Sequence, residues 1–140
     1  MNYNVFIDDE REPPNDGRQW IVCRNQHQFI QCVFDHNKYL PNFISFDHDL
    51  GEKEPSGHEI AKWIVNMVLD DIVYLPKDFD FYVHSQNPIG KKNIEGLLNP
   101  FLEAIKKSYE ISNNEERFQE LWNASENDSD EGNIIVGKLK

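Results

Sequence analysis

The sequence predicts a three-layer α/β domain built on a mainly parallel β-sheet. Short β-prone runs alternate along the chain with segments whose apolar residues recur at helical spacing, which is the order of elements in βαβ units. The central run, at residues 43–46, is apolar and stops abruptly at Asp47, as a buried parallel strand does where it reaches the sheet edge. At 140 residues, the chain is long enough to bury about two-thirds of its unfolded surface in one domain.

The first half of the chain contains three predicted strands and one predicted helix. Residues 3–7 are a short β-prone run, and the loop at 10–17 contains two prolines and an Asp-Gly turn, which exclude a helix there. Residues 20–23 are the second strand. Apolar residues at helical spacing predict a helix over 25–40, which the following proline ends. The central run described above is the third strand.

The second half is predicted to add two helices and one more strand. The strongest helical periodicity in the chain lies at residues 60–68, after a loop that ends in Ser56-Gly57. An alternating run at 79–83 predicts a strand, and residues 89–109 predict a long helix with one apolar face. Pro100 lies inside that pattern, so we expect it to kink the helix or split it in two.

The C-terminal end differs in composition from the rest of the chain. Residues 115–122 predict one more short helix and residues 134–136 an edge strand. The acidic run at 125–132 contains little that could be buried, so we expect it to be mobile. We therefore predict a domain over residues 1–110 and an acidic, partly disordered extension over residues 111–140.

Charge and cysteine content exclude several classes of protein. The formal net charge of −11 argues against a broad nucleic-acid-binding face, although it leaves room for a local basic pocket. The two cysteines, Cys23 and Cys32, lack metal-binding spacing and follow no signal peptide, so we expect reduced thiols in a cytoplasmic protein. No run approaches the roughly 18 apolar residues of a transmembrane helix, so no membrane partner is expected. The oligomeric state stays open.

Acidic residues follow two of the predicted strands and predict a metal site. Asp8 and Asp9 follow the first strand, and Asp47 and Asp49 follow the third. Because parallel strands deliver their carboxyl ends to one sheet edge, these carboxylates are expected to meet and to repel one another without a cation. Oxygen ligands in this number favour Mg²⁺ or Mn²⁺ over zinc. The alternative is a solvated turn rich in aspartate.

A second group of residues is suited to binding a phosphate and moving protons. The predicted substrate-binding residues are Ser85, Asn87, Lys91 and Arg11. The first three surround the start of the last long helix, where free backbone N–H groups favour an anion, although Lys91 could also be merely solvated. His84 and His48 are the candidates for proton transfer, because imidazole titrates near neutrality. Together with Asp47 they are the predicted catalytic residues.

Four motifs give the chain a resemblance to a known family. The motifs are Phe6-Ile7-Asp8-Asp9-Glu10-Arg11 with Pro13, Ser45-Phe46-Asp47-His48-Asp49-Leu50-Gly51, Ser56-Gly57, and Val83-His84-Ser85-Gln86-Asn87-Pro88-Ile89-Gly90. With these motifs, residues 3 to 105 resemble the cyclic-phosphate processing receiver-like family. That family is a divergent relative of response-regulator receiver domains in bacteria and bacteriophages.

The resemblance implies a receiver-like, flavodoxin-like fold in which the Pro-rich loop replaces the first helix. It also implies that Asp8, Asp9 and Asp47 bind Mg²⁺ and that Ser85 supplies the hydroxyl found after the next strand of receivers. The sequence departs from ordinary receivers in its loop and in having no lysine after a clear fifth strand, which argues against phosphoryl relay.

The family resemblance implies that the protein acts on terminal or cyclic phosphates of RNA, and its phage-borne relatives are linked to tRNA metabolism. We therefore predict a metal-dependent phosphoesterase for 2′,3′-cyclic phosphate ends of RNA or a small phosphate ester, in the host cytoplasm if the protein is phage-encoded. One alternative is a switch that accepts or senses phosphate and catalyses nothing. Another is an interaction protein in which a cation only holds the loops.

Overall fold

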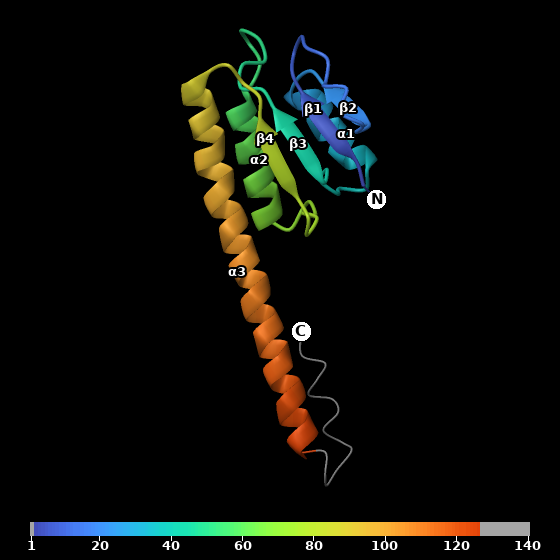
Figure 1. Ribbon diagram of the computed structural model, residues 1–140, viewed down its shortest axis with the longest axis vertical. Helices are drawn as coiled ribbons and strands as arrows, with labels where there is room; N and C mark the ends of the chain where they lie inside the picture. Colours follow the sequence, from blue (N-terminus) through green and yellow to red (C-terminus); the bar gives the residue numbers. More distant parts are fainter. Residues whose placement is uncertain (1, 127–140) are drawn as a thin grey trace. The chain divides into compact units, whose positions relative to one another are not determined.

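A computed structural model describes the backbone of residues 2–126 and the side chains of residues 2–112 (Figure 1). Within this range it contains, in chain order, β1 (Asn4–Ile7), β2 (Trp20–Cys23), α1 (Gln26–Asp35), β3 (Phe43–Phe46), α2 (Gly57–Leu69), β4 (Asp80–Val83) and α3 (Pro88–Glu126). The four strands form an all-parallel sheet in the order β2-β1-β3-β4. The predicted α/β receiver-like fold with a parallel sheet is confirmed, and so is the Pro-rich loop in place of a helix between β1 and β2.

Polar caps fix where the first two helices begin. The Asn25 side chain accepts a hydrogen bond from the Gln28 N–H at 2.9 Å, and Ser56 Oγ accepts one from the Glu59 N–H at 3.3 Å. Helix α1 ends at Asp35, five residues before the predicted end near Leu40. The reason is a left-handed turn, since Asn37 has φ 58° and Lys38 has φ 68°.

Helix α3 differs from the prediction because it continues through Pro100. A split at this proline is therefore wrong, as is a separate helix at 115–122, because those residues belong to α3. Proline removes one backbone hydrogen bond and crowds the carbonyl four residues earlier, and the helix continues in spite of this cost. The chain still divides into two compact units at this point, Met1–Asn99 and Pro100–Lys140.

The C-terminal predictions extend past the end of the described chain. The strand at 134–136 and most of the acidic run at 125–132 lie outside the described residues, and the predicted boundary at residue 110 stays a prediction. No helix in the part of the chain that the structure describes combines the length and apolar character needed to cross a membrane.

One face of the sheet packs against the helices of the first unit. Residues that share a register position in parallel strands point to the same face, and Val5 and Ile44 form one such pair. Helices α1 and α2 lie together on this face, because Phe29 and Trp63 form an edge-to-face pair with ring centroids 5.9 Å apart. Strands and helices together form one core cluster that includes Val5, Ile7, Phe29, Val33, Ile44, Phe46, Ile60, Ile64, Val83, Ile94 and Leu98.

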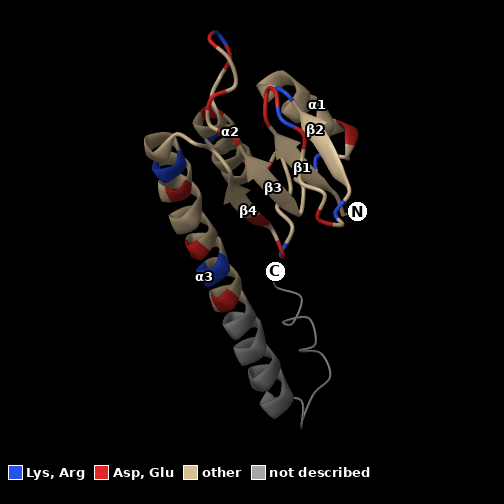
Figure 2. Ribbon diagram, turned by 45° about the horizontal axis from the view of Figure 1, so that its top comes forward, with Lys and Arg blue, Asp and Glu red and all other residues tan. Residues whose placement is uncertain are grey.

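The other face of the sheet has no helix over it among residues 2–99 (Figures 1 and 2). The step from β1 to β2 runs in the opposite direction along the sheet to the later steps, so a right-handed connection crosses the opposite face. That connection is the Pro-rich loop, and its end reaches this face, where the Arg18 guanidinium lies 4.2 Å from the Phe43 ring centroid. The predicted third layer is therefore not formed by residues 2–99.

Candidate metal and phosphate site

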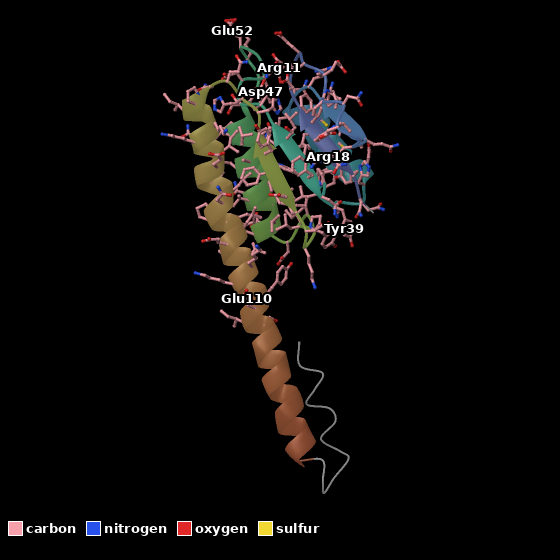
Figure 3. The ribbon with its side chains drawn as sticks, in the orientation of Figure 1. Arg11, Arg18, Tyr39, Asp47, Glu52 and Glu110 are labelled. Atoms are coloured by element: carbon pink, nitrogen blue, oxygen red, sulfur yellow. The ribbon has the colours of Figure 1, made fainter. Side chains whose placement is uncertain are left out.

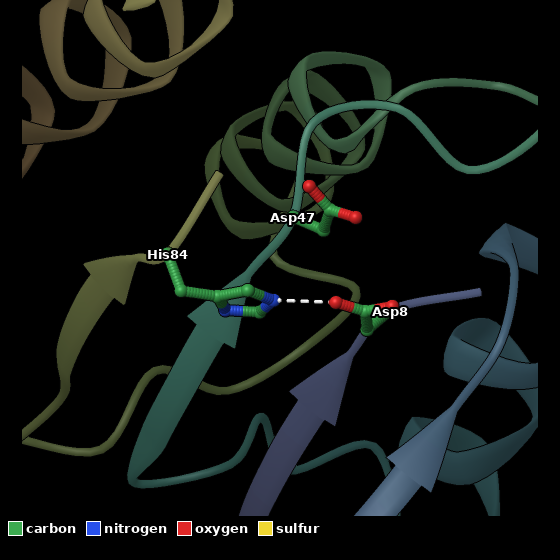
Figure 4. A group of neighbouring side chains, drawn as sticks. All are labelled: Asp8, Asp47 and His84. Carbon is green, nitrogen blue, oxygen red and sulfur yellow. Dashed lines mark hydrogen bonds and ion pairs between the residues drawn. The ribbon is translucent and has the colours of Figure 1, made fainter. Parts of the chain in front are cut away.

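Three side chains converge at the carboxyl ends of β1, β3 and β4. Asp8, Asp47 and His84 each offer one ligand atom, and these atoms all lie within 4.8 Å of one another (Figure 4). Each residue directly follows its strand, and the backbone ladder continues to it, because the Asp47 N–H donates to Ile7 O at 2.9 Å and the His84 N–H to Phe46 O at 2.8 Å. The strand register therefore places the three side chains in one row on the helix-free face.

Asp8 is the most tightly held member of this group. Its side chain is only 1% exposed, and its Oδ1 accepts hydrogen bonds from the Glu10 N–H at 2.9 Å and the Arg11 N–H at 2.8 Å. Burial alone would raise the pKa of Asp8, but the two backbone N–H groups and the His84 side chain outweigh it, so the pKa is lowered. Asp8 is thus an anion fixed in one orientation.

His84 is held from three sides. Its Nε2 lies 2.9 Å from Asp8 Oδ2, its Nδ1 lies 2.7 Å from Ser45 Oγ, and its ring stacks on Phe6 with centroids 4.5 Å apart. A hydroxyl can donate to a neutral imidazole or accept from a protonated one, so Ser45 accommodates both protonation states of His84. Ser45 was missed by the sequence reasoning; the available signal was a polar residue in an otherwise apolar strand.

Asp47 is the member of the group whose charge is least well compensated. It is 8% exposed, and its Oδ1 accepts a hydrogen bond from the His48 N–H at 2.8 Å. Burial and the nearby negative charge of Asp8 raise the pKa of Asp47, and only part of this effect is offset by that hydrogen bond, His84 and Arg11. Figure 3 shows Arg11 and Asp47 at the same end of the unit, and the Arg11 Nε lies 3.8 Å from Asp8 Oδ2.

The structure does not bring every predicted metal ligand into this group. Asp9 is exposed and is not a member of it. Asp49 is also exposed; its Oδ1 pairs with His48 Nδ1 at 2.9 Å and its Oδ2 accepts from Asn87 Nδ2 at 3.3 Å. The hydrogen bond from His48 lowers the pKa of Asp49, with a smaller contribution from Asn87. Asp49 therefore links the β3 loop to the start of α3.

His48 is positioned by a glycine at the start of α3. A Cβ atom at Gly90 would collide with the His48 ring, so only glycine permits this contact. Gly57 makes a similar close approach on the other side, because a Cβ atom there would collide with the backbone oxygen of Asp47. These two close approaches account for the glycines at positions 57 and 90 of the sequence motifs.

Two of the predicted phosphate-binding residues, Ser85 and Asn87, form a compact turn after β4. Ser85 Oγ accepts from the Asn87 N–H at 3.0 Å, and Asn87 Oδ1 accepts from the Gly90 N–H at 3.0 Å. The Lys91 ammonium lies 5.8 Å from the centroid of the Tyr82 ring. Ser85 and Asn87 are thus half-buried and hydrogen-bonded within the turn, and their role toward a phosphate stays a prediction.

Arg24 is a second residue that sequence reasoning missed. Its guanidinium donates to the backbone oxygens of Asp8 at 3.0 Å and Arg11 at 2.6 Å, and it pairs with Glu12 Oε2 at 2.8 Å. It therefore holds the turn whose N–H groups bind Asp8. No sequence signal identified it, because the contact depends on the pairing of β1 with β2.

The donor set fits a divalent cation. Two buried carboxylates that repel each other and one imidazole nitrogen are a common combination of ligands for such ions. Carboxylate oxygens suit Mg²⁺ and Mn²⁺, whereas imidazole suits softer ions. The identity of the ion stays a prediction.

An all-parallel sheet with acidic residues after its first and third strands defines a receiver-like α/β domain. The chain belongs to the cyclic-phosphate processing receiver domain family, whose family model matches residues 3–100. No curated protein and no solved structure matches the chain. The family assignment made from the four sequence motifs is confirmed.

Proposed function

We propose that the protein hydrolyses a phosphate ester in a metal-dependent reaction, and that its substrate is a 2′,3′-cyclic phosphate at the end of an RNA. The observation that carries the proposal is the convergence of Asp8, Asp47 and His84 within 4.8 Å, in a chain of the cyclic-phosphate processing receiver family. The buried carboxylates supply the charge that a metal needs, and the histidine supplies a proton carrier.

In this proposal the cation is held by Asp8 and Asp47, with His84 either as a third ligand or as the acid. When bound, a divalent cation would offset negative charge on the phosphate and promote ionisation of water. The backbone N–H groups of Glu10 and Arg11 keep the Asp8 carboxylate oriented. The Arg11 side chain, which is about half exposed and lies beside Asp8, is free to bind a phosphate oxygen.

The reaction needs one proton transfer that His84 is placed to perform. Water adds to phosphorus and loses one proton, one of the two ring P–O bonds breaks, and the departing ribose oxygen receives one proton. His84 Nε2 is the proposed donor, because it lies among the site carboxylates, 2.9 Å from Asp8 Oδ2, while Ser45 holds Nδ1 in either protonation state. The product is a phosphate monoester on one of the two ribose oxygens.

A direct test is to incubate the protein with short RNAs that end in a 2′,3′-cyclic phosphate, a 2′-phosphate or a 3′-phosphate. Mn²⁺, Mg²⁺ or EDTA is added, and the products are measured by mass spectrometry. The expected result is the addition of one water to the cyclic ends only, with metal and not with EDTA. Asp47→Asn is the inactive control. No conversion of any end with either metal would contradict the proposal.

A phospho-accepting switch is the second candidate, favoured by the place of Asp47. It directly follows the third strand and is largely buried, as expected of an aspartate that accepts phosphate in a receiver-like domain. A switch should take phosphate from acetyl phosphate, and the intact mass should rise by one phosphoryl group in the wild type but not in Asp47→Asn. That result without hydrolysis of cyclic ends would replace the enzyme proposal.

A further inference from the structure

The metal site and the aromatic residues of the helix-free face lie in adjacent rows of the same sheet. Phe6, Ser45 and Tyr82 share one register position, and Asp8, Asp47 and His84 occupy the next position on this face. Tyr82 on β4 precedes His84, which directly follows the strand, by two residues, so the two side chains emerge roughly 7 Å apart by strand rise. This separation is comparable with that of a nucleotide base from the phosphate on its own ribose.

Tyr82 is the accessible aromatic ring of this row. It is 57% exposed, whereas Phe6 is 4% exposed and covered by the His84 ring, and the more distant Phe43 is covered by Arg18. A single exposed tyrosine is common on protein surfaces. This one is distinguished by its place beside the site and by the Lys91 ammonium, which lies 5.8 Å from its ring centroid.

The charges around the ring also favour a nucleotide. Figure 2 shows the strands almost without charged residues, and Asp80 at the start of β4 is the exception among them. In a chain with a formal net charge of −11, Lys91 beside Tyr82 and Arg11 beside Asp8 are local cations at the edge of this face. Aromatic side chains on an open sheet, flanked by cations, are a known way to stack single-stranded bases.

We propose that Tyr82 stacks on the base of the nucleotide whose phosphate lies at Asp8, Asp47 and His84, so that the substrate is a nucleotide end and not any cyclic phosphate. The proposal rests on the proposed function, because it assumes that this site binds the phosphate. Stacking tolerates any base, so preference among bases is expected to be weak, and the discrimination is against a phosphate ester that has no base.

The test compares two ligands with the same phosphate group, adenosine 3′-monophosphate and glycerol phosphate. Their dissociation constants are measured by calorimetry with Mn²⁺ for the wild type, Tyr82→Ala, Tyr82→Phe and Tyr74→Ala. Tyr74 is a matched control, because it is 53% exposed and pairs with Tyr39 away from the site. Figure 3 shows Tyr39 at the opposite end of this unit from Asp47. Thermal melting confirms that each variant is folded.

We expect the adenosine compound to bind the wild type at least tenfold more tightly than glycerol phosphate. Tyr82→Ala should weaken adenosine binding by about tenfold, the low end of measured stacking effects, and leave glycerol phosphate binding unchanged. Tyr82→Phe and Tyr74→Ala should retain the wild-type preference.

Equal binding of the two ligands, or an unchanged preference in Tyr82→Ala, would overturn the inference. If the wild type still hydrolyses cyclic RNA ends in that case, the proposed function stands and the stacking inference alone fails. If the wild type neither hydrolyses cyclic RNA ends nor binds either phosphate compound, both proposals are refuted. A dimer in sedimentation equilibrium that Tyr82→Ala dissociates would also overturn it, because a second copy of the chain would then occupy the face.

Discussion

Replacing Asp47 by asparagine is expected to stabilise the metal-free protein. The pKa of Asp47 is raised by burial and by the charge of Asp8, so the folded state favours the protonated form. A group whose pKa is raised by folding stabilises the folded state at pH values below its pKa in the unfolded chain. This stabilisation is lost as the pH rises through its pKa in the folded state. At pH 7 the ionised carboxylate therefore destabilises the fold. The neutral amide of Asp47→Asn would remove this effect and could still accept the His48 N–H.

The magnitude follows from the separation of the charges. Two unit charges within 4.8 Å interact with roughly 3.5 kcal/mol at an effective dielectric constant of about 20. Arg11 and His84 offset part of this repulsion, so we expect a net gain of about 1 to 2 kcal/mol, which for a chain of this length raises the melting temperature by roughly 3 to 7 °C.

The assay is thermal unfolding in EDTA and in saturating Mn²⁺, at pH 7 and near pH 4. The gain of Asp47→Asn over the wild type should shrink at the lower pH, because the raised pKa of Asp47 leaves more of the wild type protonated there than at pH 7. Mn²⁺ should stabilise the wild type by mass action and the variant much less, with Asp9→Asn as an exposed control from the same sheet edge. A melting temperature of Asp47→Asn below that of the wild type in EDTA at pH 7 would refute the reasoning.

Three further changes test other parts of the site and the core. His84→Ala should lower hydrolysis by about a hundredfold or more, and calorimetry with Mn²⁺ will show whether metal affinity is retained, as for an acid, or lost, as for a ligand. Gly90→Ala should destabilise the protein by about 1 to 3 kcal/mol in urea unfolding, because its Cβ collides with the His48 ring, whereas Gly96→Ala should not destabilise it. The pKa of Cys32 is lowered by the Cys23 thiol and, to a lesser degree, by His36, although burial opposes this effect. Iodoacetamide should therefore alkylate Cys32 at a lower pH than Cys23, whose pKa is raised.

Much of the fold follows from local sequence patterns. The strands and the loop between β1 and β2 were predicted because each depends on a few adjacent residues. The continuation of α3 through Pro100 and the absence of a helix over one face among residues 2–99 were not predicted. The first depends on whether the helix tolerates the backbone hydrogen bond lost at Pro100. The second depends on which face of the sheet the connection from β1 to β2 crosses.

The site residues that directly follow predicted strands could be predicted from the sequence. Asp8 and Asp47 were predicted to meet because parallel strands share an edge, and they do. His84 was predicted to move protons, but its place among the potential ligands depends on the register of β4 against β3. Ser45 was not identified in advance, although it is a polar residue in an otherwise apolar strand, because its pairing with His84 crosses between strands.

Side-chain contacts hold both ends of the loop between β1 and β2, and a short exposed stretch lies between them. Arg24 binds its first residues, up to Glu12, and Arg18 is stacked on the sheet at its other end. Asp16 belongs to the second anchor, because it pairs with Arg18 and accepts a hydrogen bond from Trp20 Nε1, so the exposed residues 14 and 15 are the stretch between the anchors. Evolution can therefore lengthen or replace this stretch without altering the site, and an engineer could insert a binding peptide or a fluorescent label there to report on substrate.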